Sequence, residues 1–349
     1  MPLRQAEQRL KRLQNSPRFR DGHFHNTHAV SMMQNPMTLG MTADFAFGGA
    51  KRRPPQALPV IADTRLRLAS PPRTGLRVTW LSHSTVLIEL DGMRFLTDPV
   101  WGNRASPLSF AGPARFHPMP LAINELGRID AIVLSHDHYD HLCAETWRRL
   151  ANGACPGWSG QVVTALGVGA HLEALGIAPA NITELDWGEG LRVGEVDLIA
   201  TPAQHFSGRG VTDRNRTQWM GVAFVGPQHR VFFSGDTGPT AEHVDIGASL
   251  GPFDVVLFEI GAWHAAWGGI HLGPTGAFET FAKMRARTLL PVHWSTFDLG
   301  LHPWEQPGED LYQLAQANGA DVWFPRIGEP LEAGDRALTP WWRDVLGKK

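Results

Sequence analysis

Three histidines and two aspartates lie together in the segment His136-Asp-His-Tyr-Asp-His141. So many imidazoles and carboxylates would be a costly choice for a packed core or a plain turn, because charged groups that leave water need partners. A divalent cation is such a partner, since imidazole nitrogen and carboxylate oxygen are the ligands that zinc and related metals take in proteins. The segment therefore predicts a metal site.

Further candidates share one feature with this motif, which is that each follows a predicted strand. They are Asp98 after Phe95-Leu-Thr, His205 after Leu198-Ile-Ala-Thr-Pro, Asp236 after Val231-Phe-Phe-Ser-Gly, and His293 after Leu289-Leu-Pro-Val. Loops that follow strands can converge on one site at the edge of a sheet. We therefore expect these side chains to gather around the histidine motif.

The candidate ligands outnumber those that a single four-coordinate catalytic ion with an open position can use, so two ions explain them better. One ion is assigned His136, His138, His205 and Asp236, and the other is assigned Asp140, His141, Asp236 and His293. Asp236 then bridges the ions. A hydroxide between them would be the nucleophile, because metal charge lowers the pKa of bound water to about 7. Zinc is the first expectation for both ions, and manganese or iron is the alternative.

Other histidines and aspartates carry weaker signals. Asp98 either orients a ligand histidine from the outer shell or is a turn aspartate before Pro99, and the sequence favours neither interpretation. A single loop histidine is more often a surface or structural residue than a ligand. We set aside on this ground His23, His25, His28, His117, His171, His229, His243 and His302.

The charge of the chain is nearly balanced, with 32 Lys and Arg against 34 Asp and Glu among 349 residues. Binding to nucleic acid depends on neutralising phosphates, so this balance argues against a nucleic-acid partner. The two cysteines, Cys143 and Cys155, are too few for a disulfide framework, although the sequence leaves open that they pair. These features are typical of a globular protein from a reducing compartment.

The first residues predict a cytoplasmic protein. Residues 1–13 lack the apolar core of a signal peptide, and no apolar run is long enough to span a bilayer. Leucines and basic residues in this segment could form a short amphipathic helix on a membrane surface, which would make the protein peripheral to the membrane. A solvated terminal helix is the favoured alternative, because exposed termini are usually loosely held.

Regular structure is expected from Leu76 onward, after an N-terminal extension, residues 1–75, that is rich in Pro, Arg and Met. An Asp-Gly pair joins strand-like runs at 85–90 and 93–97 and predicts a hairpin. The other predicted elements are strands at 131–134, 161–165, 196–200, 221–225, 230–234, 255–259 and 288–292, and helices at 274–285 and 308–319. These elements predict an α+β fold with two packed sheets covered by helices, although periodicity alone does not exclude a doubly wound sheet.

The order of these residues resembles the metallo-β-lactamase superfamily, and the similarity covers roughly residues 76–330. Within that superfamily the chain is most similar to the branch of N-acyl-phosphatidylethanolamine-hydrolysing phospholipase D and its bacterial relatives. The matching stretches are Trp80-Leu-Ser-His-Ser-Thr-Val-Leu-Ile-Glu-Leu, Phe95-Leu-Thr-Asp-Pro-Val, Thr201-Pro-Ala-Gln-His-Phe-Ser-Gly-Arg-Gly, Phe233-Ser-Gly-Asp-Thr-Gly and Leu290-Pro-Val-His-Trp-Ser-Thr-Phe. The resemblance implies a four-layered αββα sandwich over residues 76–349, which the N-terminal extension wraps or flanks, and the same two-ion assignment.

The resemblance also implies that His271 lies at the active site and helps to bind or protonate the substrate, together with Asp140 and Asp236 at the reacting centre. On its chemistry alone His271 would be an ordinary loop histidine. The zinc β-lactamases carry a cysteine in the second metal site, whereas Asp236 is assigned there in this chain, so β-lactamase activity is not expected. The branch further implies a homodimer.

These features together predict a phosphodiesterase of phospholipase D type, acting on N-acylated phosphatidylethanolamine or a related small-molecule or lipid ester. Arg209, Arg214 and Arg216 follow His205 and either clamp a phosphate or form a solvated, salt-bridged loop. The apolar insert at 101–120, which contains Phe110, Phe116 and other apolar residues, either lines an acyl-chain pocket or packs on the core as a lid.

Two rival functions remain at this stage. A lactonase or carboxylic-ester hydrolase is the nearer one, because the same pair of ions can activate water against a carbonyl group. A non-catalytic metal-binding scaffold is the other. It predicts little loss of function on Asp236→Ala, whereas an enzyme would lose both turnover and metal. For His271→Ala the enzyme hypothesis predicts retained metal and a reduced rate.

Overall fold

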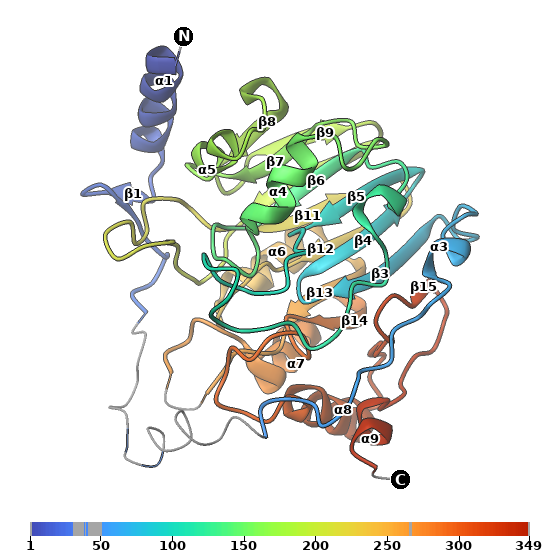
Figure 1. Ribbon diagram of the computed structural model, residues 1–349. Coiled ribbons are helices and arrows are strands. Elements are labelled where there is room, and N and C mark those ends of the chain that lie inside the picture. The colour runs from blue at the N-terminus through green and yellow to red at the C-terminus, as the bar shows by residue number, and fades with distance from the viewer. Residues whose placement is uncertain (1, 31–37, 39, 41–50, 265–266, 348–349) are drawn as a thin grey trace.

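Two sheets pack face to face, and helices cover their outer faces (Figure 1). The computed structural model describes residues 2–30, 38, 40, 51–264 and 267–347. Helices α4 and α5 lie on one side of the sandwich, and α6, α7 and α8 lie on the other (Figure 1). This arrangement confirms the predicted αββα fold class.

The first sheet has seven strands in the order β15-β3-β4-β5-β6-β7-β8. They are β3 (Leu76–Ser82), β4 (Thr85–Leu90), β5 (Met93–Thr97), β6 (Ala131–Leu134), β7 (Val162–Ala165), β8 (Ile182–Leu185) and β15 (Pro330–Glu332). The predicted hairpin is present as β4–β5, in which Leu90 pairs with Met93. Because β4 is antiparallel to both β3 and β5, and β5 is parallel to β6, the strands β3, β5 and β6 all end at the same edge.

The second sheet has six strands in the order β14-β13-β12-β11-β10-β9. They are β9 (Gly190–Val193), β10 (Val196–Thr201), β11 (Gly221–Val225), β12 (Arg230–Phe233), β13 (Phe253–Glu259) and β14 (Ala286–Val292). β12, β13 and β14 are parallel, and β10 runs in their direction because β11 is antiparallel to both β10 and β12. Four strands of this sheet therefore also end at a common edge.

Helices cover the outer faces of the sheets (Figure 1), and the sequence predicted two of them, α7 and α8. They are α4 (Ala144–Ala151), α5 (Gly169–Ala174), α6 (Glu242–Leu250), α7 (Gly273–Lys283), α8 (Gln306–Asn318) and α9 (Trp342–Val345), with short 3-10 turns at Ile123–Glu125 and Pro179–Asn181. α7 packs on β13 and β14 and contacts α6 and α8. The two predicted helices are confirmed, and α8 ends where Gly319 takes the left-handed conformation that glycine adopts without strain.

Large aromatic side chains fill the space between the sheets. Phe95 of β5 meets Phe224 of β11 across the sandwich, with ring centroids 5.2 Å apart, and both are fully buried. Full burial of such a side chain contributes roughly 1.5–3 kcal/mol. β6 is buried at every position, because it lies in the interior of a sheet with both faces covered. This packing holds the strand ends in fixed positions.

The N-terminal extension packs on the sandwich through short elements. They are α1 (Pro2–Asn15), β1 (Phe19–Arg20), β2 (His23–Phe24) and α3 (Thr64–Arg67). Phe24 is fully buried in a cluster with Leu166 and Trp219, and Arg9 of α1 pairs with Glu184 at 3.0 Å. α1 itself projects from the body of the molecule (Figure 1). The domain boundary after residue 75 stays a prediction.

Two further sequence features can be placed in the described residues. None of the described helices is both long enough and apolar enough to cross a bilayer. Cys143 and Cys155 are buried and free, so they do not form the disulfide that the sequence left open.

Candidate metal centre

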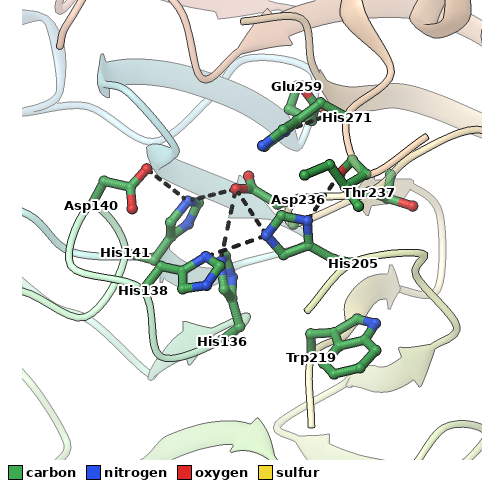
Figure 2. A network of polar contacts seen from close by, with 12 residues as sticks. His136, His138, Asp140, His141, His205, Trp219, Asp236, Thr237, Glu259 and His271 are labelled. Carbon is green, nitrogen blue, oxygen red and sulfur yellow. Dashed lines mark hydrogen bonds and ion pairs between the residues drawn. The ribbon is translucent and has the colours of Figure 1, made fainter. Parts of the chain in front are cut away.

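The strand ends of both sheets meet at one edge of the sandwich and bring the candidate ligands together. In the first sheet β5 and β6 end just before Asp98 and His136, and in the second sheet β10, β12 and β14 end shortly before His205, Asp236 and His293. Figure 2 shows the side chains of this region directed toward a common centre. Neither sheet supplies the whole set, so the centre depends on how the two sheets pack.

The first group of ligand atoms contains His136, His138, His205 and Asp236, and these atoms lie within 4.8 Å of one another. His138 Nδ1 lies 2.8 Å from His136 Nε2 and 3.3 Å from His205 Nε2. Asp236 Oδ2 lies 3.8 Å from His136 Nε2 and 3.7 Å from His205 Nε2. This is the set that the sequence assigned to one ion.

The second group contains Asp140, His141 and His293, together with His83. Asp140 Oδ2 lies 3.2 Å from His293 Nε2 and 3.5 Å from His141 Nε2. Asp236 Oδ2 lies 3.2 Å from each of the same two nitrogens. The same oxygen of Asp236 thus borders both groups, which is the position that a bridging ligand requires.

His83 is a member of the second group that the sequence interpretation did not assign. Its Nε2 atom lies 3.0 Å from Asp140 Oδ2, and its ring centroid lies 3.9 Å from that of His293. The sequence did contain grounds to propose His83 as a ligand, because it directly follows β3 and lies in a stretch that matches the family. It was missed because its neighbours are serines rather than further ligands.

Asp98 lies behind the ligands and makes three contacts. Its Oδ2 atom lies 2.6 Å from His141 Nδ1 and accepts a hydrogen bond from Ser135 Oγ, and its Oδ1 accepts one from the Ser135 backbone amide at 2.7 Å. A carboxylate in this place fixes the tautomer of the histidine and turns Nε2 toward the centre. The geometry favours the outer-shell interpretation of Asp98 over that of a turn residue.

Two other ligand rings are also held at the nitrogen that faces away from the centre. His136 Nδ1 lies 2.9 Å from Ser135 Oγ, and His205 Nδ1 lies 2.9 Å from the carbonyl oxygen of Ile270. These contacts leave Nε2 of both rings for the centre. Gly235 permits the approach of Asp236, because its φ is +57° and a Cβ there would meet the Met220 carbonyl oxygen at 2.6 Å.

Burial and charge act in opposite directions on these groups. Burial and the neighbouring imidazoles hold the pKa of His136 and of His205 well below its ordinary value. Burial also lowers the pKa of His293, but the carboxylates of Asp236 and Asp140 outweigh it and raise that pKa to about 10. The same carboxylates raise the pKa of His141. The two groups therefore differ in how much negative charge surrounds their imidazoles.

The residues fit two divalent cations. His141 Nε2 and Asp236 Oδ1 are buried without a hydrogen-bond partner, although orphaned polar atoms of this kind are rare in folded proteins. His136 Nε2 and His138 Nδ1 face each other at hydrogen-bond distance in a space where a cation would satisfy both lone pairs. Among the described residues, none of the eight histidines set aside from the sequence belongs to a candidate metal group.

A cavity of about 490 Å³ opens onto both groups. His271 lines it, as the resemblance implied, beside ligands from each group. The rest of the wall is apolar and consists of Phe206, Ala262, Trp267, Ile270 and Leu299. A volume of this size suits a ligand of drug-like dimensions.

Glu259 is a second buried carboxylate beside this cavity that the sequence interpretation did not single out. It is fully buried, and its Oε1 atom lies 3.4 Å from His271 Nδ1. Burial raises the pKa of Glu259, while the nearby imidazoles of His271 and His293 oppose that rise. Its position at the end of β13 matches that of the metal ligands at the ends of other strands.

The structure does not bring the four predicted substrate contacts to the cavity wall. Arg209 donates to the carbonyl oxygens of Asp137 and Leu142 and stacks on Tyr139, so it braces the turn of the histidine motif. Arg214 lies over the ring of Phe206, which lines the cavity, and Arg216 is exposed. Phe110 is 78% exposed in the insert. None of the four is among the described residues that line the cavity.

Asn26 links the N-terminal extension to a ligand. Its side-chain amide donates to the His205 carbonyl oxygen at 2.8 Å, and its Oδ1 accepts from the His205 backbone amide at 3.0 Å. Trp219 Nε1 donates to the same Oδ1 at 3.2 Å. The sequence carried no signal for this contact, because Asn26 lies far from every motif.

Comparison with known proteins places this centre in a family. The beta-lactamase superfamily domain matches residues 93–294, a range that holds every candidate ligand except His83. The chain therefore belongs to the beta-lactamase superfamily, in which it is a metal-dependent hydrolase.

Individual relatives extend the match beyond that range. N-acyl-phosphatidylethanolamine-hydrolyzing phospholipase D 1 of Caenorhabditis elegans is 39% identical over 276 residues, which cover 75% of this chain and 77% of the worm protein. An uncharacterized protein of Mycobacterium tuberculosis is 40% identical over 335 residues, which cover 94% of this chain and 88% of that protein.

Solved structures share the fold at lower identity. The isothiocyanate hydrolase from Delia radicum gut bacteria superposes with a TM-score of 0.57 and 20% identity, and the alignment covers 74% of this chain and 100% of that chain. At this level of identity the likeness shows the common fold and carries no information on the substrate.

Proposed function

We propose that this chain is a phosphodiesterase of phospholipase D type, with N-acylated phosphatidylethanolamines and related phosphodiesters as its substrate class. The observation that carries the proposal is the cavity, in which the bridging Asp236 and an apolar wall face the same space. A substrate with a polar ester and an apolar chain fits such a surface. The worm relative, whose name states this activity, supports the choice of ester.

Two divalent ions, with zinc first and manganese or iron as alternatives, would be held by the two groups of ligands described above. When bound, such ions lower the pKa of water and neutralise charge on the departing oxygen. The protein's own part is to fix the ligands. Asp98 orients His141, and the Ile270 carbonyl oxygen orients His205. The apolar wall keeps bulk water away from the ester, which strengthens every electrostatic contact inside.

A specific observation favours a second candidate, a lactonase or carboxylic-ester hydrolase. No Lys or Arg occurs among the described residues that line the cavity. Phosphate recognition commonly uses bidentate arginine contacts, and a neutral ester does not need them. Arg214 lies over the ring of Phe206, which lines the cavity, and is a cationic candidate for contact with a phosphate.

A substrate panel distinguishes the two candidates. Purified protein loaded with zinc or manganese is assayed on N-acylated phosphatidylethanolamine, bis(p-nitrophenyl) phosphate, p-nitrophenyl butyrate and a sugar lactone. We expect the highest kcat/KM on the N-acylated phospholipid. Rapid opening of lactones with no turnover of either phosphodiester would reject the phosphodiesterase proposal and support the second candidate.

The variant Asp236→Ala separates an enzyme from a metal-binding scaffold. Because Asp236 Oδ2 borders both groups of ligands, its loss is expected to remove bound metal and to lower turnover by about a thousandfold or more. Asp197→Ala, on the partly exposed face of β10, is the matched control and keeps both properties. Undiminished turnover by a folded, metal-free Asp236→Ala protein would contradict the proposal that this chain is a metal-dependent enzyme.

A further inference from the structure

Glu259 is a buried carboxylate with too few polar contacts to explain its burial. It is the last residue of β13 and is fully buried, and it pairs in register with Val292, the neighbour of the ligand His293. Its Oε1 atom accepts a hydrogen bond from the Leu272 backbone amide at 2.5 Å, and its Oε2 atom has no hydrogen-bond partner. A buried carboxylate is costly unless it is paired, so one backbone amide accounts poorly for its presence.

The natural partner of Glu259 is His271. His271 Nδ1 lies 3.4 Å from Glu259 Oε1, and the His271 side chain is only 11% exposed. The other face of His271 meets the metal centre, because its ring centroid lies 5.4 Å from that of His293 and 5.1 Å from that of His205. Figure 2 shows the ring with Glu259 on one side and its second nitrogen directed toward Asp236 on the other.

The two residues differ in how firmly the fold holds them. Glu259 belongs to β13, an interior strand that is parallel to both of its neighbours, whereas His271 lies in the loop between β13 and α7. The Glu259 carboxylate faces the ring of His271 and accepts a hydrogen bond from the backbone amide of Leu272, the residue that follows His271. One rigid side chain thus fixes both the loop backbone and the imidazole that the loop presents.

We propose that Glu259 is a positioning residue that keeps the His271 proton on Nδ1 and turns Nε2 toward the scissile ester. This inference rests on the proposed hydrolytic function, but it does not depend on which ester is cleaved. Glu259 itself touches no substrate. It acts through His271, which is the catalytic residue of the pair.

The pair supports transfer of a proton to the leaving group. The attacking water supplies its hydroxyl group to the ester centre, and the proton that it releases is taken up by Nε2 of His271, which the Nδ1 tautomer leaves free to accept it. As the bond between the ester centre and the departing oxygen breaks, its electron pair stays on that oxygen, which takes this proton from Nε2. Glu259 stabilises the positive charge of the ring at the moment when the proton is held. The net reaction consumes one water and yields an alcohol and an acid.

A double-mutant cycle tests this role. Glu259→Gln keeps an oxygen acceptor for the Leu272 amide but removes the charge, so it is expected to lower kcat by about a hundredfold while KM stays within about twofold. His271→Ala should have an effect of similar size. If Glu259 acts through His271, adding Glu259→Gln to His271→Ala changes kcat by less than about twofold. A multiplicative loss in the double variant would overturn the proposal.

Two measurements separate this outcome from a loss of metal or fold. Metal content, determined by elemental analysis, should be unchanged in both single variants, and loss of metal from His271→Ala would show that His271 is a ligand instead. Glu184→Gln is the matched control, because Glu184 also accepts a backbone amide, from Gly169 at 2.8 Å, but lies away from the cavity. It should leave kcat unchanged.

A third measurement needs neither turnover nor a variant that folds. In the metal-free wild-type protein, nitrogen-15 NMR of labelled histidine should report His271 with its proton on Nδ1. A proton on Nε2 would overturn the proposal. Absence of turnover on the whole substrate panel, with the expected tautomer present, would instead count against the proposed function and leave the pairing of Glu259 with His271 supported.

Discussion

Three ligand histidines of the metal centre are held from behind, at the ring nitrogen that faces away from the centre. Asp98 holds His141, Ser135 holds His136, and a backbone carbonyl oxygen holds His205. A ring fixed in this way has its metal-facing nitrogen in place before a cation arrives, so less entropy is lost on binding. We expect the outer contacts to matter nearly as much as the ligands.

The role of His83 can be tested by substitution. His83→Ala removes the imidazole that lies 3.0 Å from Asp140 Oδ2, so the second ion should bind about 10 to 100 times more weakly, whereas the first ion keeps its affinity. Titration with zinc in the presence of a competing chelator measures the two constants. The control His23→Ala, on the exposed surface, should change neither. Equal weakening of both ions would contradict the assignment of His83 to the second group.

Sequence alone predicted the ligands whose neighbours also carry metal chemistry. The segment from His136 to His141 was recognised because it holds five histidines and aspartates in six residues. Asp236 and His293 were recognised because each follows a predicted strand. His83 and Glu259 could not be predicted with the same force, because each is a lone polar residue at a strand end and acquires its partners only when the two sheets pack. Arg209, Arg214 and Arg216 follow His205 along the chain but are not among the described residues that line the cavity, so their role in substrate binding stays a prediction.

At the scale of elements, most interior strands and the edge strand β14 were predicted, whereas the interior strand β3 and three edge strands were missed. β6 and β12 have apolar runs because both of their faces are covered, and that pattern is legible in the sequence. The edge strands β8, β9 and β15 are short and partly exposed, so they carry little hydrophobic pattern and were missed.

The segment around β2 acts on the metal centre from outside the sandwich. Because Asn26 bonds both the amide and the carbonyl of His205, Asn26→Ala should weaken binding of the first ion by about tenfold and lower the free energy of unfolding by about 1–2 kcal/mol. Metal titration and urea denaturation measure the two effects. Asn152→Ala, exposed at the end of α4, is the control. Unchanged zinc affinity in Asn26→Ala would show that the extension does not support the site.

Helix α6 gives the fold a pH dependence of its own. His243 is buried between Phe232 and Phe258 without a hydrogen-bond partner, and burial lowers its pKa to about 4. In the unfolded chain the pKa is about 6.5, so between these values only the unfolded state binds the proton. The contribution of His243 to the free energy of unfolding is therefore fully present above about pH 6.5. It is lost as the pH falls to about 4, and the total loss is on the order of 3 kcal/mol.

Urea denaturation of metal-free wild type and His243→Leu, at pH 7.5 and 4.5, isolates this contribution. Both proteins share the other titrating groups, so the wild type should lose more stability than the variant over that interval. Parallel losses in the two proteins would mean that His243 does not titrate on unfolding.

At the scale of the whole molecule, the metal centre joins the two sheets. Its ligands come from strand ends in both, so each bound ion should stabilise the folded state by about 4 kcal/mol at a thousandfold excess over Kd, and stripping both should lower Tm by roughly 10 °C. Differential scanning calorimetry before and after chelation measures this shift. Re-added zinc should restore Tm in the wild type but not in Asp236→Ala. A Tm indifferent to chelation would contradict a centre that bridges the sheets.

The ligands are also spread unevenly along the chain. Those of the first group are all made once synthesis has passed Asp236, whereas the second group also needs His293, which follows β14. On the ribosome, where the N-terminal part emerges first, a nascent chain can gather one complete set of donors while the other is still inside the exit tunnel. The nascent protein is thus expected to acquire its ions one after the other, and its metal centre is complete only after β14 and His293 have left the tunnel.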